Sequence, residues 1–141
     1  MLARPGYRRS NTRVEVVSAA VAALAGVATV VASGRILLGL GEAGYPVFRP
    51  VLLFNSVMGI LYLAAAMLIL RRAPSARWLA AIIALANVIV LLLVVVLRAS
   101  DGIVADETLV AMSLRAALWL AIAVALGYPW QPRPAGQRRQ V

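Results

Sequence analysis

The fold class of this chain follows from residues 108–126, which read TLVAMSLRAALWLAIAVAL. At a rise of about 1.5 Å per residue, a helix of this length matches the roughly 30 Å hydrocarbon core of a bilayer. Arg115 lies near the middle of the segment. A charge at that depth costs about 2.5 to 3.5 kcal/mol, because arginine stays protonated. The segment therefore predicts a membrane-spanning helix whose guanidinium needs a compensating contact.

The composition extends this prediction to the whole chain. Its 141 residues are 63% hydrophobic, against about 45 to 50% in soluble domains. We predict an all-α integral membrane protein with a basic N-terminus (1–13), a domain over 14–126 and a flexible basic tail (127–141). The four transmembrane helices are expected at 14–33, 51–70, 78–97 and 108–126. The first could also be a secretory signal, but signals have only about 7 to 15 apolar residues, so a retained helix is favoured.

The arginines predict how the helices are oriented. All 14 basic residues are arginine, and the net charge is +9. Ten arginines lie in the N-terminus, in the loop after the second segment and in the tail, and three lie in the other two loops. Since positively charged loops stay in the cytoplasm, both termini are expected there. The arginine- and alanine-rich composition indicates a bacterial inner membrane, and arginines that flank apolar segments do not predict a nucleic-acid partner.

The missing residue types exclude several kinds of site. The chain contains neither cysteine nor histidine, which excludes disulfides, thiolate nucleophiles and imidazole or thiolate metal ligands. None of the five acidic residues lies in the middle of an apolar segment, so no carboxylate pair for proton transfer is predicted. We therefore expect no catalytic residue, no metal site and no cofactor, and the chain is not predicted to be an enzyme.

Five polar or aromatic residues form the predicted contact site. Arg115, Asn55 and Asn87 lie in the outer half of the predicted membrane domain, roughly 10, 6 and 15 Å from the outer ends of their helices. Tyr62 shares a helix face with Asn55. Trp119 follows Arg115 by one turn, within reach of a cation–π contact. We expect this set to contact a partner, an anionic ligand or a lipid.

A second interpretation of Arg115 needs no ligand. Its guanidinium could extend outward to phosphate headgroups, or to Asp106 and Glu107 near the start of the same helix. The two asparagines would then hydrogen-bond to neighbouring helices. The interpretations differ in whether Arg115 faces outward or into the protein.

Small residues at every fourth position predict where helices approach closely. They are Ser18, Ala22 and Gly26 in the first segment, Gly59 in the second, and Ser113, Ala117, Ala121 and Ala125 in the fourth. Arg115 lies about 160° around the helix from the fourth-segment stripe, and a four-helix bundle cannot easily bury both faces. Either the alanine stripe packs inside and Arg115 points outward, or Arg115 points inward and the stripe meets a partner.

Three short motifs predict local structure. Thr12 and Glu15 have the spacing of a capping box, in which the two side chains satisfy backbone N–H groups at a helix start. Ser75 is a candidate N-cap for the third helix. The glycines of residues 39–44 predict a turn rather than a nucleotide-binding loop, because no strand precedes them.

These features favour one functional class and leave a second open. The opposed faces, short loops and missing catalytic groups favour a non-catalytic accessory or assembly subunit of a larger bacterial inner-membrane complex. The alternative is a small oligomeric transporter or channel, in which Arg115, Asn55 and Asn87 line a path for an anionic solute. The expected partners are the lipid bilayer together with other membrane subunits or further copies of the chain.

Overall fold

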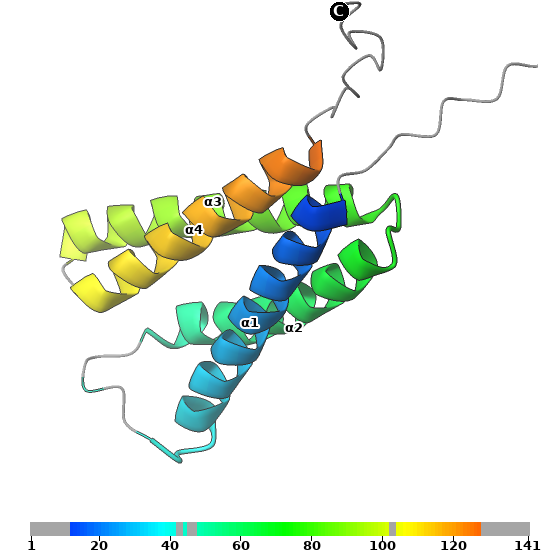
Figure 1. Ribbon diagram of the computed structural model, residues 1–141. Coiled ribbons are helices and arrows are strands. Elements are labelled where there is room, and N and C mark those ends of the chain that lie inside the picture. Colours follow the sequence, from blue (N-terminus) through cyan, green and yellow to red (C-terminus); the bar gives the residue numbers. More distant parts are fainter. Residues whose placement is uncertain (1–11, 42–43, 45–47, 102–103, 128–141) are drawn as a thin grey trace, which may run out of the picture.

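The computed structural model describes residues 12–41, 44, 48–101 and 104–127. Regular structure in these residues consists of four helices, α1 (Thr12–Leu37), α2 (Arg49–Leu70), α3 (Ala76–Asp101) and α4 (Asp106–Gly127) (Figure 1). All four are long and apolar enough to span a membrane, and the described residues contain no strand. The all-helical, four-helix prediction is therefore confirmed. Most of the predicted N-terminal and C-terminal segments lie outside the described residues.

Each helix extends beyond the apolar segment that predicted it. The predicted limits were set at the nearest arginine, glycine, proline or acidic residue, but α1 continues through Arg35 to Leu37 and α3 continues through Arg98 to Asp101. A long arginine side chain keeps its charge at a surface while its backbone stays helical. At about 1.5 Å per residue, the helices are roughly 33 to 39 Å long.

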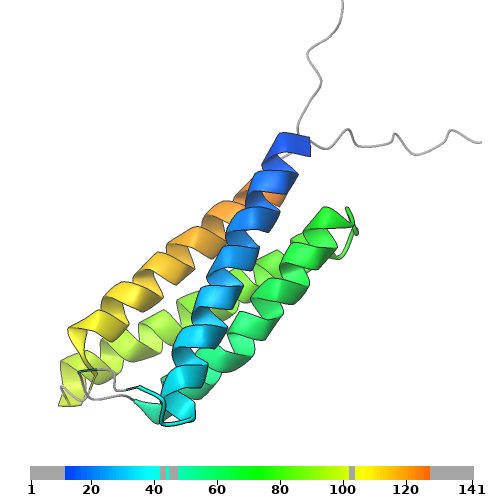
Figure 2. The ribbon, with the colours of Figure 1, turned by 60° about the horizontal axis from the view of Figure 1, so that its bottom comes forward.

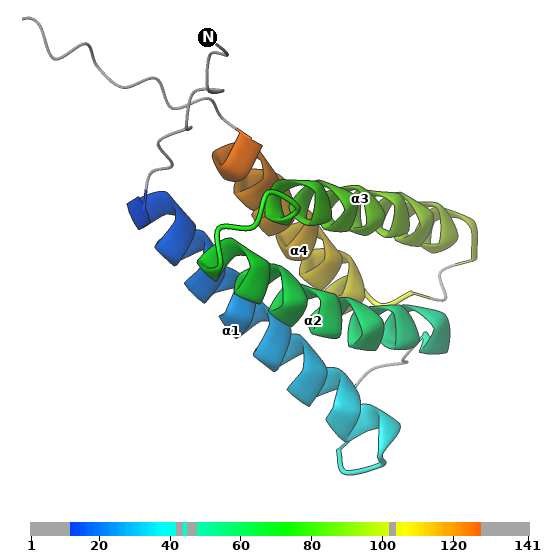
Figure 3. The same cartoon turned by 90° about the vertical axis from the view of Figure 1, so that its right-hand side faces the viewer.

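The helices form two hairpins, α1 with α2 and α3 with α4. Figure 3 shows the two pairs, and α2 and α3 join them through a smaller contact. The α1–α4 side is the least packed of the four. Figure 1 shows α1 and α4 diverging from the end that carries residues 12 and 127. Figure 2 shows these two helix ends on the same side of the molecule, as expected for two antiparallel hairpins.

The α1–α2 pair is held together at two facing glycines. A Cβ atom added to Gly26 would lie 3.1 Å from the carbonyl oxygen of Gly59 and 2.9 Å from the Leu63 side chain. A Cβ on Gly59 would lie 2.7 Å from Cγ2 of Val30. The two backbones thus approach at the distance that small residues permit.

Helices α1 and α2 end in the same hydrogen-bonding motif. At the end of α1, Gly39 N–H donates to the Ile36 carbonyl at 3.2 Å, and Leu40 N–H donates to that of Arg35 at 2.8 Å. This is a Schellman motif, in which the residue after the cap takes a left-handed backbone conformation. Gly39 has φ +67°, and Gly44 has φ +69°; the rest of the predicted turn lies partly outside the described residues.

Arg72 occupies the corresponding position at the end of α2. Its N–H donates to the Ile69 carbonyl at 2.9 Å, and Ala73 N–H donates to that of Leu68 at 3.0 Å. Arg72 therefore has φ 53°, a conformation that costs a residue with a Cβ about 1 to 2 kcal/mol.

The side chain of Arg72 contacts both residues of the predicted capping box. Its Nη2 donates to Oγ1 of Thr12 at 3.0 Å, and its Nε lies 3.3 Å from Oε2 of Glu15. Thr12 is the first residue of α1, and the residue before it lies outside the described residues, so the capping box stays a prediction. Arg72, in the turn between α2 and α3, thus makes a hydrogen bond from its charged guanidinium to Thr12 and an ion pair with Glu15.

Candidate functional site

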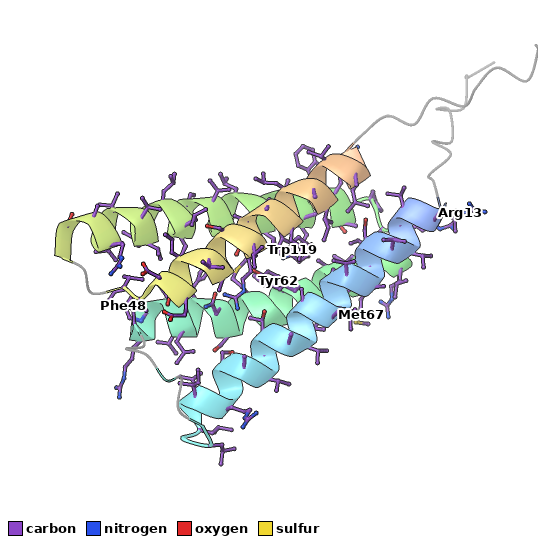
Figure 4. All side chains as sticks on the ribbon, turned by 60° about the vertical axis from the view of Figure 1, so that its left-hand side comes forward. Arg13, Phe48, Tyr62, Met67 and Trp119 are labelled. Carbon is purple, nitrogen blue, oxygen red and sulfur yellow. The ribbon has the colours of Figure 1, made fainter. Side chains whose placement is uncertain are left out.

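The five predicted contact residues separate into two groups. Tyr62, Asn87 and Trp119 are completely buried between α2, α3 and α4. Figure 4 shows Tyr62 and Trp119 between their helices in the middle of the molecule. Asn55 and Arg115 are half-buried. They lie near the C-terminal end of α1, where α1 and α4 are farther apart (Figure 1).

The group of Tyr62, Asn87 and Trp119, here the closed cluster, is joined by direct contacts. The Tyr62 hydroxyl donates to Oδ1 of Asn87 at 2.9 Å, and Nδ2 of Asn87 donates to the Ile83 carbonyl at 2.9 Å. The Tyr62 and Trp119 rings lie 4.7 Å apart between centroids, at 39°. A buried amide whose oxygen and nitrogen both have partners stabilises a fold. Nε1 of Trp119 is buried without a hydrogen-bond partner, but none of the three side chains is exposed, so the closed cluster has no surface for a ligand.

Trp119 does not cover Arg115 in the way the spacing allowed. Its ring packs against Tyr62, and the cation–π contact found within the described ranges joins Arg77 to Trp78 at 5.4 Å. The two side chains have different surroundings: Trp119 is completely buried, whereas Arg115 lines a cavity.

Arg115 has no carboxylate partner in the described parts of the chain. Ion pairs there join Arg72 to Glu15 and Arg98 to Asp106, the latter at 2.8 Å. Nη1 of Arg115 contacts the sulfur of Met112 at 3.8 Å, and a thioether is a weak acceptor. The outward interpretation in which Asp106 neutralises Arg115 therefore fails, because Asp106 binds an arginine of α3.

Arg115 lines a cavity of ≈ 90 Å³ between α1, α2 and α4, here the Arg115 cavity. Its polar lining residues are Thr29, Ser33, Asn55, Thr108 and Arg115; the others include Phe48, Val51, Leu52 and Ala111. Oδ1 of Asn55 is buried without a hydrogen-bond partner. The Ser33 hydroxyl donates to the Thr29 carbonyl at 2.7 Å, which leaves its oxygen lone pairs as acceptors. The cavity thus combines a cation with an unsatisfied amide.

The α1 wall of this cavity was missed from the sequence, although a signal was present. Thr29 and Ser33 continue the stripe of Ser18, Ala22 and Gly26 by steps of three and four residues. All five are buried on one face of α1. The change from small apolar to hydroxyl residues along that face marks where packing against α2 gives way to the cavity.

The second stripe, on α4, has a different environment. Ser113, Ala117 and Ala121 are exposed and Ala125 is half-buried, while Arg115 faces inward to its cavity. Of the two arrangements that the sequence allowed, the helix therefore adopts the one with the charged face inside. Ala121 and Ala125 border an apolar groove of ≈ 410 Å³, here the α1–α4 groove, together with Val17, Ser18, Val21 and Ile122.

No metal-binding group of side chains is present in the part of the chain that the structure describes. It contains no group of three or more acidic, histidine or cysteine residues that could hold a metal ion. The chemistry available at the Arg115 cavity is charge pairing and hydrogen bonding. Comparison with known proteins found no match, whether to protein-family models, to curated proteins or to solved structures.

Proposed function

We propose that the chain is a non-catalytic accessory or assembly subunit of a larger bacterial inner-membrane complex. It would cross the bilayer four times with both termini in the cytoplasm, as the distribution of arginines favours. The observation that carries the proposal is the unfilled α1–α4 side, where the exposed stripe of Ser113, Ala117 and Ala121 adjoins the α1–α4 groove.

The packing rules of membrane helices support a helix of another subunit as the occupant of this side. Lipid tails are as apolar as leucine, so helices associate through close backbone approach at small residues rather than through the hydrophobic effect. The α1–α2 pair already uses such an approach at Gly26 and Gly59. Ala117 and Ala121 offer a similar surface on α4, and both are exposed in the part of the chain that the structure describes.

The absence of native cysteine makes a crosslinking test clean. Ala121→Cys places one thiol at the groove, and Leu85→Cys places a matched thiol on the exposed face of α3. We expect crosslinking in native membranes to join Ala121→Cys, but not Leu85→Cys, to one defined membrane protein. Ala121→Trp should abolish co-purification of that protein, whereas Leu85→Trp should not. Equal crosslinking at both positions, or co-purification that survives Ala121→Trp, would contradict the proposal.

The orientation can be tested separately. A reporter that works only in the cytoplasm should be active when it is fused after residue 126. A reporter that works only in the periplasm should be inactive at the same position. A fusion after residue 103, in the α3–α4 connection, should give the reverse pattern. A periplasmic signal from the first fusion would refute the proposed topology without bearing on the partner.

A small oligomeric channel or transporter for an anionic solute is the second candidate. It is favoured by Arg115 and Asn55, which line one cavity. In liposomes that contain purified protein, this function predicts anion flux that Arg115→Gln abolishes and Arg98→Gln retains. Protein-dependent flux would favour the channel, and its absence with a stable partner complex would favour the accessory subunit.

A further inference from the structure

The Arg115 cavity has the features of a binding site, and these do not depend on the partner at the α1–α4 groove. We propose that the Arg115 cavity binds a phosphate-type oxyanion, presented by a phospholipid headgroup or dissolved as inorganic phosphate. Three properties of the described residues carry this proposal: the charge state of Arg115, the unsatisfied amide of Asn55 and the size and position of the cavity.

The first property is the contrast between Arg115 and two other arginines. Arg72 and Arg98 each lie within 4.0 Å of a carboxylate, and their side chains are 55% and 40% exposed. Arg115 is half-buried and contacts a methionine sulfur instead. A buried cation without a counter-charge is costly. A guanidinium presents its N–H donors in a planar fork that matches two oxygens of a phosphate, so an oxyanion relieves this cost.

The second property is the amide of Asn55. Its oxygen is buried and unpaired in the wall of the same cavity, and an unsatisfied buried polar atom costs about 1 to 3 kcal/mol. Rotation about the terminal bond exchanges the oxygen for the NH₂ group, which has two donors. Asn55 can thus donate a hydrogen bond to an anion bound by Arg115. Thr29 and Thr108 line the same cavity, and a threonine hydroxyl is also a hydrogen-bond donor.

The third property is size. One water molecule needs roughly 10 to 15 Å³ of cavity volume. The Arg115 cavity has a volume of ≈ 90 Å³ and therefore accommodates a group of several heavy atoms. A phosphate group meets this condition, whereas a single halide ion leaves most of the space unused. The volume is too small for an acyl chain, so a phospholipid would insert its phosphate and keep its tails outside, along the diverging α1 and α4 helices (Figure 1).

The position of the cavity is compatible with either source of phosphate. Asn55 follows the start of α2 by six residues and Arg115 follows the start of α4 by nine. At about 1.5 Å per residue, the two lie roughly 9 and 13 Å from those helix ends. This depth is close to the headgroup region of a leaflet and also within reach of solute from the aqueous side.

Native mass spectrometry of the purified chain in phospholipid-free dodecyl maltoside tests the proposal. One arm adds dioleoyl phosphatidylglycerol and the other adds inorganic phosphate. In at least one arm, we expect a one-to-one adduct whose apparent Kd rises about tenfold or more in Arg115→Gln, because a charge-assisted contact is lost. Arg98→Gln, which removes an exposed charge outside the cavity, should bind like the wild type, and Arg115→Lys should fall between.

Two further measurements guard against a variant that misfolds. Ala111→Trp keeps the guanidinium but fills the cavity, and it should lose the adduct while its helical circular dichroism stays unchanged. In the wild type, the bound oxyanion should slow phenylglyoxal modification of Arg115 severalfold without slowing that of Arg98. An adduct with the lipid alone identifies a headgroup, and one with phosphate alone identifies a dissolved solute. No saturable adduct in either arm, or equal affinity in Arg115→Gln and Arg98→Gln, would overturn the proposal.

Discussion

Tyr62 and Asn55 lie on the same face of α2, two turns apart, yet their surroundings differ. Tyr62 belongs to the closed cluster, in which its hydroxyl and both polar atoms of the Asn87 amide have partners. Asn55 lies in the wall of the Arg115 cavity, where its oxygen has none. Both residues are polar side chains on an apolar helix. Nε1 of Trp119 also lacks a hydrogen-bond partner, but it is completely buried inside the closed cluster. What marks Asn55 as a candidate binding residue is therefore a missing partner together with a place in the wall of a cavity.

The largest expected effect comes from breaking the closed cluster at Trp119. Trp119→Ala removes the largest fully buried side chain and should lower the free energy of unfolding by about 3 to 5 kcal/mol. Trp78→Ala is the matched control, because Trp78 is 64% exposed and stacks on Arg77; it should cost less than about 1 kcal/mol. SDS titration in mixed micelles, followed by circular dichroism, measures both. Equal losses would mean that the cluster is no better packed than the surface.

The next effect concerns the close contact on the packed side of the bundle. Gly59→Ala places a Cβ 2.7 Å from Val30 Cγ2 and 3.1 Å from its backbone nitrogen, so the helices must separate. We expect a loss of about 1 to 3 kcal/mol in the same titration. Gly34→Ala is the control, since a Cβ there meets nothing within 4 Å. It should stabilise α1 by about 0.5 to 1 kcal/mol, and the same sign for both variants would contradict the predicted contact.

Much of this packed side was readable from the sequence, because it depends on local pattern. Four long apolar segments predicted four helices, and small residues at every fourth position marked the buried face of α1 around Gly26. The pattern could not decide how α4 faces, since its two opposed stripes are equally regular. That choice depends on how neighbouring helices pack, with Tyr62 of α2 beside the ring of Trp119.

The candidate site was only partly predictable for the same reason. Asn55 and Asn87 looked equivalent as single amides in apolar segments, and the difference between them arises from Tyr62, 25 residues from Asn87 in the chain. Likewise, the Thr12 hydroxyl accepts a hydrogen bond from Arg72, 60 residues away, which the local capping-box pattern did not indicate. Periodicity gives the face of a helix on which a side chain lies, but not the identity of the group opposite.

The two asparagines offer the most direct test of the comparison. Asn87→Leu leaves the buried Tyr62 hydroxyl without its acceptor and should destabilise the protein by about 1 to 2 kcal/mol. Asn55→Leu removes an oxygen that has no partner, so stability in phospholipid-free detergent should stay the same or rise. Unfolding titrations of both variants side by side measure the difference. A larger loss for Asn55→Leu would show that Asn55, not Asn87, is the structural amide.

The smallest effect concerns the turn after α2, where Arg72 takes a conformation that glycine takes at the end of α1. Arg72→Ala removes the contacts to Thr12 and Glu15 but keeps the left-handed backbone of φ 53°. Because exposed ion pairs contribute about 0.2 to 1 kcal/mol, we expect a loss of stability in that range.

Arg72→Gly loses the same contacts but relieves about 1 kcal/mol of backbone strain. It should therefore be as stable as the wild type and more stable than Arg72→Ala. Gly39→Ala introduces that strain into α1 without removing a side chain and should cost about 1 kcal/mol. Unfolding titrations in low and high salt separate the two contributions, since salt weakens the ion pair and leaves the backbone strain unchanged. Equal stability of Arg72→Ala and Arg72→Gly would show that the turn carries no strain, and that Arg72 acts through its charge alone.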